Sequence, residues 1–305
     1  MKMCPFFGIC GGCKYDFTSP DYSAQKISEL ARLPITGDAV WIDAGTRRRA
    51  DFAFADGVFG FYQHRSKAIV PVRCCPLCCV AINDVLPAVA SLPWGGAGAV
   101  LVTACDNGID IAVTSAVPYF SSEFKNAAAR LDVLRVTWNG RVVVQNATPI
   151  VKFGDVSVEY LPGAFLQPTI VGADILRDMV VAAAAGAHRC ADLFCGLGNF
   201  TYALGADGFD IAGAGVRRDL FRNPLTVGML NKYDCVVMDP PRAGAIAQCT
   251  ELVKSNVGRV IYISCNPQTW VRDAEILKQK YSLVSLVPVD QFVGSAHWEL
   301  FSLFA

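Results

Sequence analysis

Arg259-Val-Ile-Tyr-Ile-Ser-Cys-Asn-Pro267 is the stretch of sequence from which we predict the fold. Val260 to Ile263 is a run of β-branched and aromatic residues, and this composition is typical of a buried strand. The Asn-Pro pair ends the strand, and the residues from Thr269 to Lys280 have the pattern of a helix. Cys265 therefore stands at the carboxyl end of a core strand, just before a helix begins. Open α/β sheets bind their ligands along that edge.

Cys265 has two interpretations at this position. The N-terminus of a helix lowers the pKa of a nearby thiol and increases the fraction that is present as reactive thiolate. Free cysteines are also among the most buried residue types, so an inert core cysteine is the alternative. The stretch alone favours neither interpretation, and the rest of the chain has to decide between them.

The composition indicates a folded chain with room for two domains. The chain has 305 residues, of which 53% are hydrophobic and 18% charged, and these values argue against disorder. The formal net charge is +0, so a nucleic-acid surface must be a local patch. The sequence has neither a membrane span nor the apolar segment of a signal peptide. Thirteen cysteines without an export signal indicate metal binding or catalysis rather than a disulfide framework.

Three cysteines near the beginning of the chain predict a metal centre. Cys4, Cys10 and Cys13 lie within ten residues, and two glycines let the backbone turn before the last of them. A second group, at positions 74, 75, 78 and 79, can supply the missing fourth ligand. An iron–sulfur cluster is favoured over zinc, because the spacing is not the paired two-residue spacing of common zinc sites. Four unrelated buried cysteines are the remaining alternative.

The middle region, from Ile82 to Gln145, has mostly the pattern of strands, with Asn-Gly turn signals before two of them, and it contains no evident catalytic constellation. It is more consistent with a platform that presents a ligand than with a reaction centre. A candidate phosphate-binding patch precedes this region and consists of Arg47, Arg48, Arg49, His64, Arg65 and Lys67. A solvated strand face is the alternative interpretation for any one of these residues.

The second half of the chain has the pattern of a nucleotide-binding sheet. An alanine-rich helix over Ile170–Ala187 precedes a strand that runs into Gly196-Leu-Gly198 and a further helix. The order Asp-x-Phe-x-Gly-x-Gly-x-Phe after a strand is more specific for S-adenosylmethionine than for a dinucleotide, since the third glycine is missing. Asn199, Asp239 and Cys265 each follow a predicted strand, and this repeated placement predicts one shared active site.

Taken together, these motifs resemble the iron–sulfur-containing RNA uracil-C5 methyltransferases, the group that methylates 23S ribosomal RNA. The resemblance covers nearly the whole chain. Its markers are Cys4, Cys10-Gly-Gly-Cys13, Gly60-Phe-Tyr62 with Ser66 and Ile69-Val70, Cys75-Pro-Leu77, Phe165-Leu-Gln167, Asp192-Leu-Phe-Cys-Gly-Leu-Gly-Asn-Phe-Thr201, Asp219-Leu-Phe221, Asp239-Pro-Pro-Arg-Ala-Gly244, Ser264-Cys-Asn-Pro267 and His297-Trp-Glu299.

The resemblance implies an α/β fold in which a Rossmann-like methyltransferase sheet (161–305) follows a β-rich, iron–sulfur-bearing RNA-recognition region (1–160). It implies a [4Fe-4S] cluster and S-adenosylmethionine as cofactors. It also implies a cytoplasmic monomer that acts on RNA, most simply 23S ribosomal RNA, without a membrane partner. The implied cluster ligands are Cys4, Cys10, Cys13 and Cys75. The implied methyl-donor site contains Gln167, Phe194, Asn199, Asp219 and Asp239, and the implied catalytic pair is Cys265 as nucleophile and Glu299 as base.

The implied chemistry explains the nucleophile and the base. Uracil C5 takes a methyl group from a sulfonium only after a thiolate has added to C6 and made C5 nucleophilic. A base then removes the C5 proton, and the thiolate leaves. The target uridine has to be unpaired or flipped out of a helix.

One departure from the family concerns the segment from Tyr202 to Arg218. The family has a further strand, an acidic ribose-binding residue and a helix there, and this segment is short. We therefore expect the second strand and its helix to be truncated, and we assign the ribose-binding role to neither Asp207 nor Asp210. Two other functions remain open: an RNA cytosine-C5 methyltransferase, and a catalytically silent RNA-binding protein.

Overall fold

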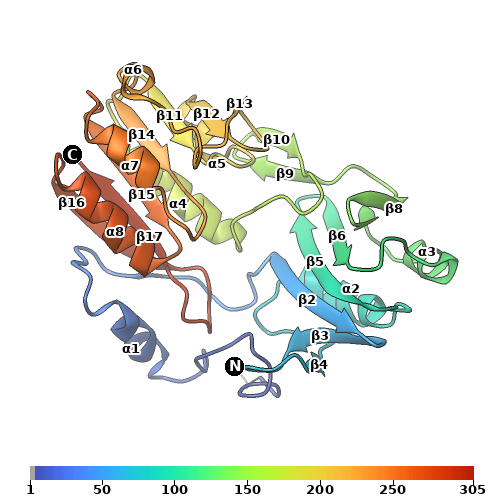
Figure 1. Cartoon of the computed structure of the whole chain (residues 1–305). Helices are drawn as coiled ribbons and strands as arrows, with labels where there is room; N and C mark the ends of the chain where they lie inside the picture. The colour runs from blue at the N-terminus through green and yellow to red at the C-terminus, as the bar shows by residue number, and fades with distance from the viewer. Residues whose placement is uncertain (1–3) are drawn as a thin grey trace. The chain divides into compact units, whose positions relative to one another are not determined.

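A computed structural model describes residues 4–305, and the chain forms two compact units (Figure 1). The first unit contains the described residues up to Gln25, together with Asp43–Ile170 and Val293–Ala296. The second unit contains Lys26–Ile42, Val171–Phe292 and His297–Ala305. Each unit therefore consists of three separate stretches of the chain, whereas the sequence suggested a single boundary after residue 160.

The first unit is built on a seven-stranded sheet. Its strand order is β4-β3-β2-β5-β6-β7-β8, and all neighbouring pairs are antiparallel except β6 and β7. The strands are β2 (Arg49–Ala55), β3 (Val58–Tyr62), β4 (Ile69–Pro71), β5 (Ala97–Cys105), β6 (Gly108–Ser115), β7 (Arg135–Trp138) and β8 (Arg141–Gln145). A separate hairpin of β9 (Ile150–Phe153) and β10 (Val156–Glu159) follows.

The core of this unit is an aromatic cluster between the sheet and two helices, α2 (Val80–Ala90) and α3 (Ser122–Ala128). The Phe54 and Trp94 rings lie 4.7 Å apart, and the Phe124 and Trp138 rings lie 5.1 Å apart. Such pairs bury large apolar areas and have favourable ring geometry. The Asn139-Gly140 turn between β7 and β8 has positive φ at both residues, as the Asn-Gly hairpin signal predicts.

The second unit contains an eight-stranded mixed sheet of order β1-β16-β17-β15-β14-β11-β12-β13. Only β17 runs antiparallel to its neighbours, β15 and β16. The strands are β1 (Val40–Trp41), β11 (Cys190–Leu193), β12 (Asp207–Asp210), β13 (Val216–Arg217), β14 (Cys235–Met238), β15 (Arg259–Ser264), β16 (Leu283–Asp290) and β17 (Glu299–Phe304). The strand order reverses direction between β11 and β14, and such switch points open a crevice at the carboxyl ends of the strands.

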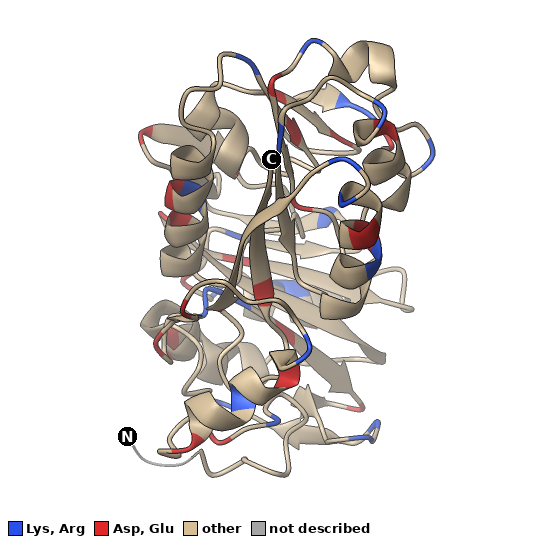
Figure 2. Ribbon diagram, turned by 90° about the vertical axis from the view of Figure 1, so that its left-hand side faces the viewer, with Lys and Arg blue, Asp and Glu red and all other residues tan. Residues whose placement is uncertain are grey.

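Helices cover both faces of this sheet (Figures 1 and 2). The helices of this unit are α4 (Ile170–Ala183), α5 (Asn199–Leu204), α6 (Val227–Leu230), α7 (Ile246–Leu252) and α8 (Pro267–Leu277). The short helix α1 (Tyr22–Ile27, followed by the 3-10 turn Ser28–Leu30) crosses the boundary between the two units. Alternate residues of one strand enter opposite cores: Val260 and Tyr262 of β15 pack with α7 and α8, whereas Ile261 and Ile263 pack with α4. This two-sided burial explains why the strand reads as a continuous apolar run.

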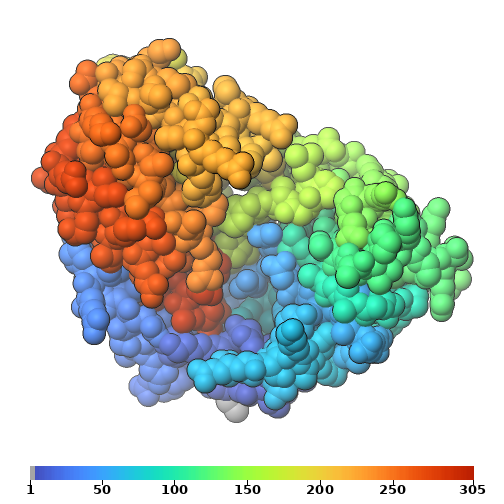
Figure 3. Space-filling model, in the orientation of Figure 1, coloured from blue at the N-terminus to red at the C-terminus, as the bar shows by residue number. Residues whose placement is uncertain are grey.

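The segment after the glycine loop corrects one expectation. The second strand is present as β12, which pairs with β11 over Ala191–Leu193. The following helix is missing: among the described residues, no helix lies between β12 and α6. In place of the helix, residues 211–215 connect β12 directly to β13. This connection lies at the surface and is coloured gold in Figure 3. The expected truncation therefore applies to the helix and not to the strand.

A buried ion pair joins the beginning of the second unit to the end of β16. The Lys26 ammonium donates to the Asp290 carboxylate and to the Phe292 carbonyl at 2.9 Å, and both charged side chains are fully buried. The ammonium also lies 5.0 Å from the centre of the Trp298 ring. Within residues 4–305, no helix combines the length and the apolar character that a membrane crossing needs.

We predict that Lys26→Met destabilises the protein by about 3–5 kcal/mol, because it leaves the Asp290 carboxylate buried without its cation. Lys278→Met is the matched control, since Lys278 pairs with Glu275 on an exposed helix face, where ion pairs contribute about 0–1 kcal/mol. Urea unfolding of both variants measures the difference. Equal unfolding midpoints for the two variants would contradict the importance of the buried pair.

Candidate functional site

The carboxyl edge of the parallel strands in the second unit collects the polar residues that the sequence singled out. Phe194 and Asn199 follow β11, Asp239 follows β14 and Cys265 follows β15. The backbone N–H of Asp239 donates to the Leu193 carbonyl at 3.2 Å, so the ends of β14 and β11 are joined directly. These two ends flank the switch point of the sheet.

Cys265 and Glu299 become neighbours through the register of β15 and β17. Ser264 pairs with Leu300 in this antiparallel ladder. The next position along each strand therefore sets Cys265 opposite Glu299. Glu299 is only 2% exposed, and its Oε2 accepts a hydrogen bond from Gln291 Nε2 at 3.1 Å.

The environment of Cys265 raises its pKa to about 12. Burial is the largest cause, the Glu299 and Asp239 carboxylates add to it, and Arg242 opposes them. The expectation that the following helix would lower this pKa is therefore wrong, because burial and two nearby carboxylates outweigh the helix terminus.

Burial also raises the pKa of Glu299 to about 7, and the hydrogen bond from Gln291 acts in the opposite direction. A carboxyl with a pKa near 7 exchanges protons readily at neutral pH, which suits a general base.

The loop that follows Cys265 is tied to the loop that follows β14. Asn266 caps α8 by accepting from the Gln268 backbone N–H at 3.1 Å. Its amide also donates to the Arg242 carbonyl at 3.0 Å, and the Thr269 hydroxyl donates to the same carbonyl at 3.2 Å. The Ser-Cys-Asn-Pro motif thus ends a strand, begins a helix and joins two loops of the carboxyl edge.

The glycine loop after β11 contains backbone conformations that most residues rarely adopt. Phe194 has a φ of 63°, which is uncommon for a residue other than glycine. Gly198 has a φ of 98°, and a Cβ there would lie 2.5 Å from the Tyr202 ring. The Phe194 ring lies 5.3 Å from the ring of Phe221, a residue of the short segment before α6. This apolar pair stands beside the loop that was expected to hold the methyl donor.

Asp192 and Asp210 secure this loop, and neither received a role from the sequence. The Thr201 hydroxyl donates to Asp192 at 2.6 Å, and burial raises the pKa of Asp192 to about 7. Asp210, at the end of β12, accepts from the backbone N–H groups of Gly196 at 2.9 Å and Ala212 at 3.2 Å. Its position at the end of the strand next to β11 was the signal that could have identified it.

The remaining predicted donor-site residues have diverse surroundings. The Asn199 amide donates to the Ala173 carbonyl at 3.2 Å. Asp219 accepts from the backbone N–H groups of Phe221 and Arg222, at 3.1 Å and 3.2 Å. Gln167 belongs to the first unit, where its backbone carbonyl accepts from Arg48 Nε at 3.2 Å. Four of the five residues therefore share the second unit, and Gln167 does not.

The four predicted cluster ligands act on one another electrostatically within the first unit. Burial raises the pKa of Cys13 to about 12, and the Cys75, Cys10 and Cys4 thiols raise it further. A hydrogen bond from the Cys78 thiol lowers the pKa of Cys75 to about 6. Over residues 4–305, however, no group of three or more histidine, cysteine or carboxylate side chains has an arrangement that could hold a metal ion. The donor chemistry is thus suitable for an iron–sulfur cluster, while the ligand arrangement is not shown.

The candidate basic patch is partly wrong. Arg48 is buried, and Arg47 Nε donates to the Arg49 carbonyl at 3.0 Å. His64, Arg65 and Lys67 are exposed, as a phosphate-binding patch requires. In Figure 2 the Lys and Arg residues are interspersed with Asp and Glu, so no broad face of one sign is visible in that view.

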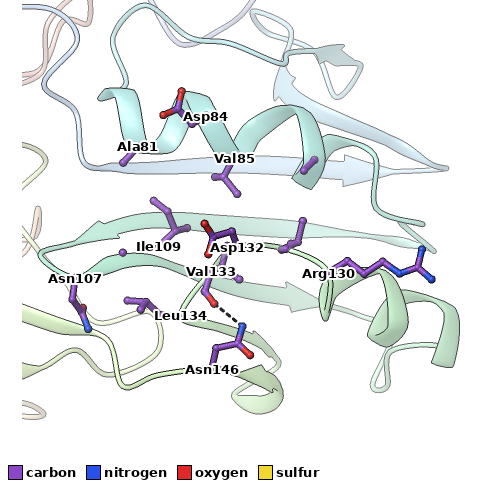
Figure 4. Close-up of a pocket in the computed structure, with 13 residues that line it drawn as sticks. Ala81, Asp84, Val85, Asn107, Ile109, Arg130, Asp132, Val133, Leu134 and Asn146 are labelled. Atoms are coloured by element: carbon purple, nitrogen blue, oxygen red, sulfur yellow. Dashed lines mark hydrogen bonds between the residues drawn. The ribbon is translucent and has the colours of Figure 1, made fainter.

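A separate pocket of about 670 Å³ lies in the first unit (Figure 4). It is bounded by α2, by the turn between β5 and β6 and by residues 130–134. Asp84, Arg130 and Asp132 are its charged lining residues. None of the predicted catalytic, donor-site or cluster residues lines it.

Comparisons with known proteins agree on one family. The family model described as tRNA (uracil-5-)-methyltransferase matches residues 211–304. An uncharacterized RNA methyltransferase of Caulobacter vibrioides is 34% identical, over 99% of this chain and 85% of the relative. The 23S rRNA (uracil(1939)-C(5))-methyltransferase of Photobacterium profundum is 26% identical, over 99% of this chain and 79% of the relative.

A solved structure supports the fold. The Pyrococcus abyssi tRNA (uracil-54, C5)-methyltransferase, in complex with S-adenosyl-L-homocysteine, superimposes with a TM-score of 0.73 at 20% identity. The match covers 93% of this chain and 83% of that chain. The predicted α/β architecture with a methyltransferase-type sheet is thereby confirmed, with the sheet mixed.

We predict that Glu299→Gln accelerates alkylation of Cys265 at pH 8.5 by up to about tenfold, the change for one pKa unit. The Glu299 carboxylate raises the thiol pKa, so an uncharged amide leaves more thiolate. Iodoacetamide labelling followed by peptide mass spectrometry measures the rate. The exposed Cys74 is the internal reference and should react equally in both proteins. An unchanged ratio of the Cys265 and Cys74 rates would show that Glu299 does not act on the thiol.

Proposed function

Because the chain belongs to the RNA uracil-C5 methyltransferase family, we propose that it methylates C5 of a uridine in 23S ribosomal RNA. In this proposal S-adenosylmethionine is the donor, Cys265 the nucleophile and Glu299 the base. The single observation that carries the proposal is the β15–β17 register, which makes Cys265 and Glu299 neighbours at the carboxyl edge.

The proposed reaction uses the two residues in sequence. Cys265 first loses its thiol proton to solvent. The thiolate sulfur then adds to uracil C6, and the electron pair of the C5–C6 double bond moves toward the C4 carbonyl, so that C5 becomes nucleophilic. C5 then takes the methyl group of S-adenosylmethionine. The bond between this methyl group and the sulfonium breaks, and S-adenosylhomocysteine leaves with the electron pair on its sulfur. Glu299 then accepts the C5 proton, the double bond re-forms and the Cys265 sulfur leaves with its electron pair.

The ionisation of the two residues fits this order. At neutral pH Cys265, with a pKa of about 12, carries its proton until the substrates arrive. Glu299, with a pKa of about 7, can accept a proton in one step and release it in the next turnover. Burial is the largest cause of the raised pKa of both residues.

The donor is proposed to bind at the switch point between β11 and β14. The strained glycine loop, the Phe194 and Phe221 rings and Asp239 border that position. We add Asp210 to the donor-site proposal with Gln167, Asn199 and Asp219, because it ends the strand next to β11 and holds the loop through Gly196. The presence of β12 also weakens the case for a catalytically silent protein, which rested on the shortened segment.

The choice of 23S ribosomal RNA rests on the resemblance and on the Photobacterium relative, whose name specifies that substrate. The Pyrococcus enzyme acts, by its title, on tRNA. A uracil whose C6 has to meet a thiol at a sheet edge cannot remain stacked in a helix, so the substrate should present an unpaired or flipped uridine.

Cys265→Ala is predicted to abolish methyl transfer to 23S ribosomal RNA and to prevent covalent trapping by 5-fluorouridine RNA. Glu299→Gln should instead accumulate a methylated protein–RNA adduct with unmodified RNA, and its turnover should fall by about 10²–10⁴-fold. Labelled donor and denaturing gels measure both effects. Cys195→Ala is the control for a cysteine of the glycine loop. Adduct formation by Cys265→Ala would reject Cys265 as the nucleophile, and methylation of tRNA alone would reject the ribosomal substrate.

We also propose that Cys4, Cys10, Cys13 and Cys75 bind a [4Fe-4S] cluster. Support comes from the mutual influence of their thiols and from the hydrogen bonds that orient two of them. The Gly12 backbone N–H donates to Cys10 Sγ at 3.3 Å. The Asn83 amide oxygen accepts from the Cys75 backbone N–H at 2.8 Å, so the turn that carries Cys75 is held firmly. A bound cluster would cross-link this turn to the N-terminal cysteine segment.

Anaerobically purified protein is expected to contain four iron and four sulfide per chain, as a [4Fe-4S] cluster requires. Cys75→Ser should lower both contents strongly, whereas Cys74→Ser, its exposed neighbour, should leave them unchanged. Elemental analysis and the visible absorption spectrum provide the measurement. Stoichiometric zinc without iron would reject the cluster.

A further inference from the structure

Gln291 and Glu299 form a buried contact that the family resemblance does not assign. Gln291 follows the last residue of β16, and Glu299 is the first residue of β17. The two side chains are 1% and 2% exposed, and Gln291 Nε2 lies 3.1 Å from Glu299 Oε2. An amide N–H can only donate, so the contacted carboxyl oxygen accepts.

Lys26 contacts the chain next to Gln291 and the chain next to Glu299. Its ammonium donates to Asp290 and to the Phe292 carbonyl, the residues on either side of Gln291. It also lies over the ring of Trp298, which precedes Glu299, and the Trp298 indole N–H donates to the Lys26 carbonyl at 3.3 Å. The amide of Gln291 and the carboxyl of Glu299 are thus presented to each other by one buried cation.

We infer that Gln291 is a positioning residue that keeps Glu299 ionised and correctly oriented to accept the uracil C5 proton. This inference rests on the proposed function. Hydrogen bonds to an ionised carboxylate are roughly twice as strong as those to neutral groups. A buried carboxyl without such a donor is protonated over a wider pH range, and a protonated carboxyl cannot take the C5 proton.

The charged groups near Glu299 define what the amide contributes. Cys265 faces Glu299 across the β15–β17 ladder, and Asp239 and Arg242 act on the same thiol. Lys26 and Asp290 neutralise each other at the end of β16. Burial raises the pKa of Glu299, and Gln291 is the group that lowers it. Removing the amide donor should therefore raise this pKa further.

The test is the pH dependence of kcat for Gln291→Met, which has a similar length and no N–H donor. Its acidic limb should move about one unit to higher pH, and kcat at pH 6 should fall about tenfold, while the alkaline limit is kept. Trapping by 5-fluorouridine RNA should be unchanged, because addition of Cys265 precedes the step that uses Glu299. At pH 6 the variant should accumulate methylated adduct with unmodified RNA.

Two further variants separate positioning from folding. Gln248→Met removes another buried amide of the same unit, which hydrogen-bonds the Leu225 backbone instead of a carboxyl group. It should lower stability without moving the pH profile. Gln291→Glu keeps the size of the side chain, and since two adjacent carboxyls resist joint ionisation, it should move the acidic limb at least as far. An unmoved acidic limb in folded Gln291→Met and Gln291→Glu overturns the inference.

A direct titration distinguishes this inference from the proposed function. The chain has six glutamates, so NMR of protein that contains carboxyl-labelled glutamate gives few resonances. The resonance that is missing from Glu299→Gln belongs to Glu299. An upward shift of its titration in Gln291→Met supports the inference, and an unchanged titration overturns it. Failure of the proposed function is recognised separately, because wild-type protein then yields neither 5-methyluridine nor a trapped adduct.

Discussion

The antiparallel register of β15 against β17 is the constraint on which the candidate site depends. It pairs Ser264 with Leu300, and therefore brings the residue after one strand and the first residue of the other to the same place. A slip of one residue would turn every side chain of β17 to the opposite face of the sheet. The two-sided burial of β15 resists such a slip, because Ile261 and Tyr262 belong to different cores.

Burial gives this edge its chemical character. The same exclusion of water raises the pKa values of Cys265 and Glu299, although it leaves one protonated and the other near its midpoint at neutral pH. The difference arises from their ordinary pKa values and from the hydrogen bond that Gln291 donates to Glu299. A thiol and a carboxyl can thus have complementary roles within one environment.

The shortened segment after β12 shows how a fold keeps a site when it loses an element. The helix that would cover this edge is absent from the described chain, yet β12 still pairs with β11, and Asp210 still reaches the glycine loop. The exposed side chains of Ile211, Val216 and Phe221 are the consequence. Backbone pairing with a central strand is sufficient to maintain the position of an acidic residue without a covering helix.

The sequence by itself determined the elements whose signals are local. The apolar run before Cys265 predicts β15, and Asn139-Gly140 predicts a hairpin, because composition and turn geometry depend on neighbouring residues. The pattern from Thr269 onward predicts α8, although the helix begins two residues earlier, at Pro267. The order of the motifs also identified the family. Only the tertiary structure decided that Gln291 contacts Glu299, that Arg48 is buried and that the Cys265 pKa is raised rather than lowered. These properties depend on groups that are far apart in the sequence, and burial and charge are set by what surrounds a side chain in space.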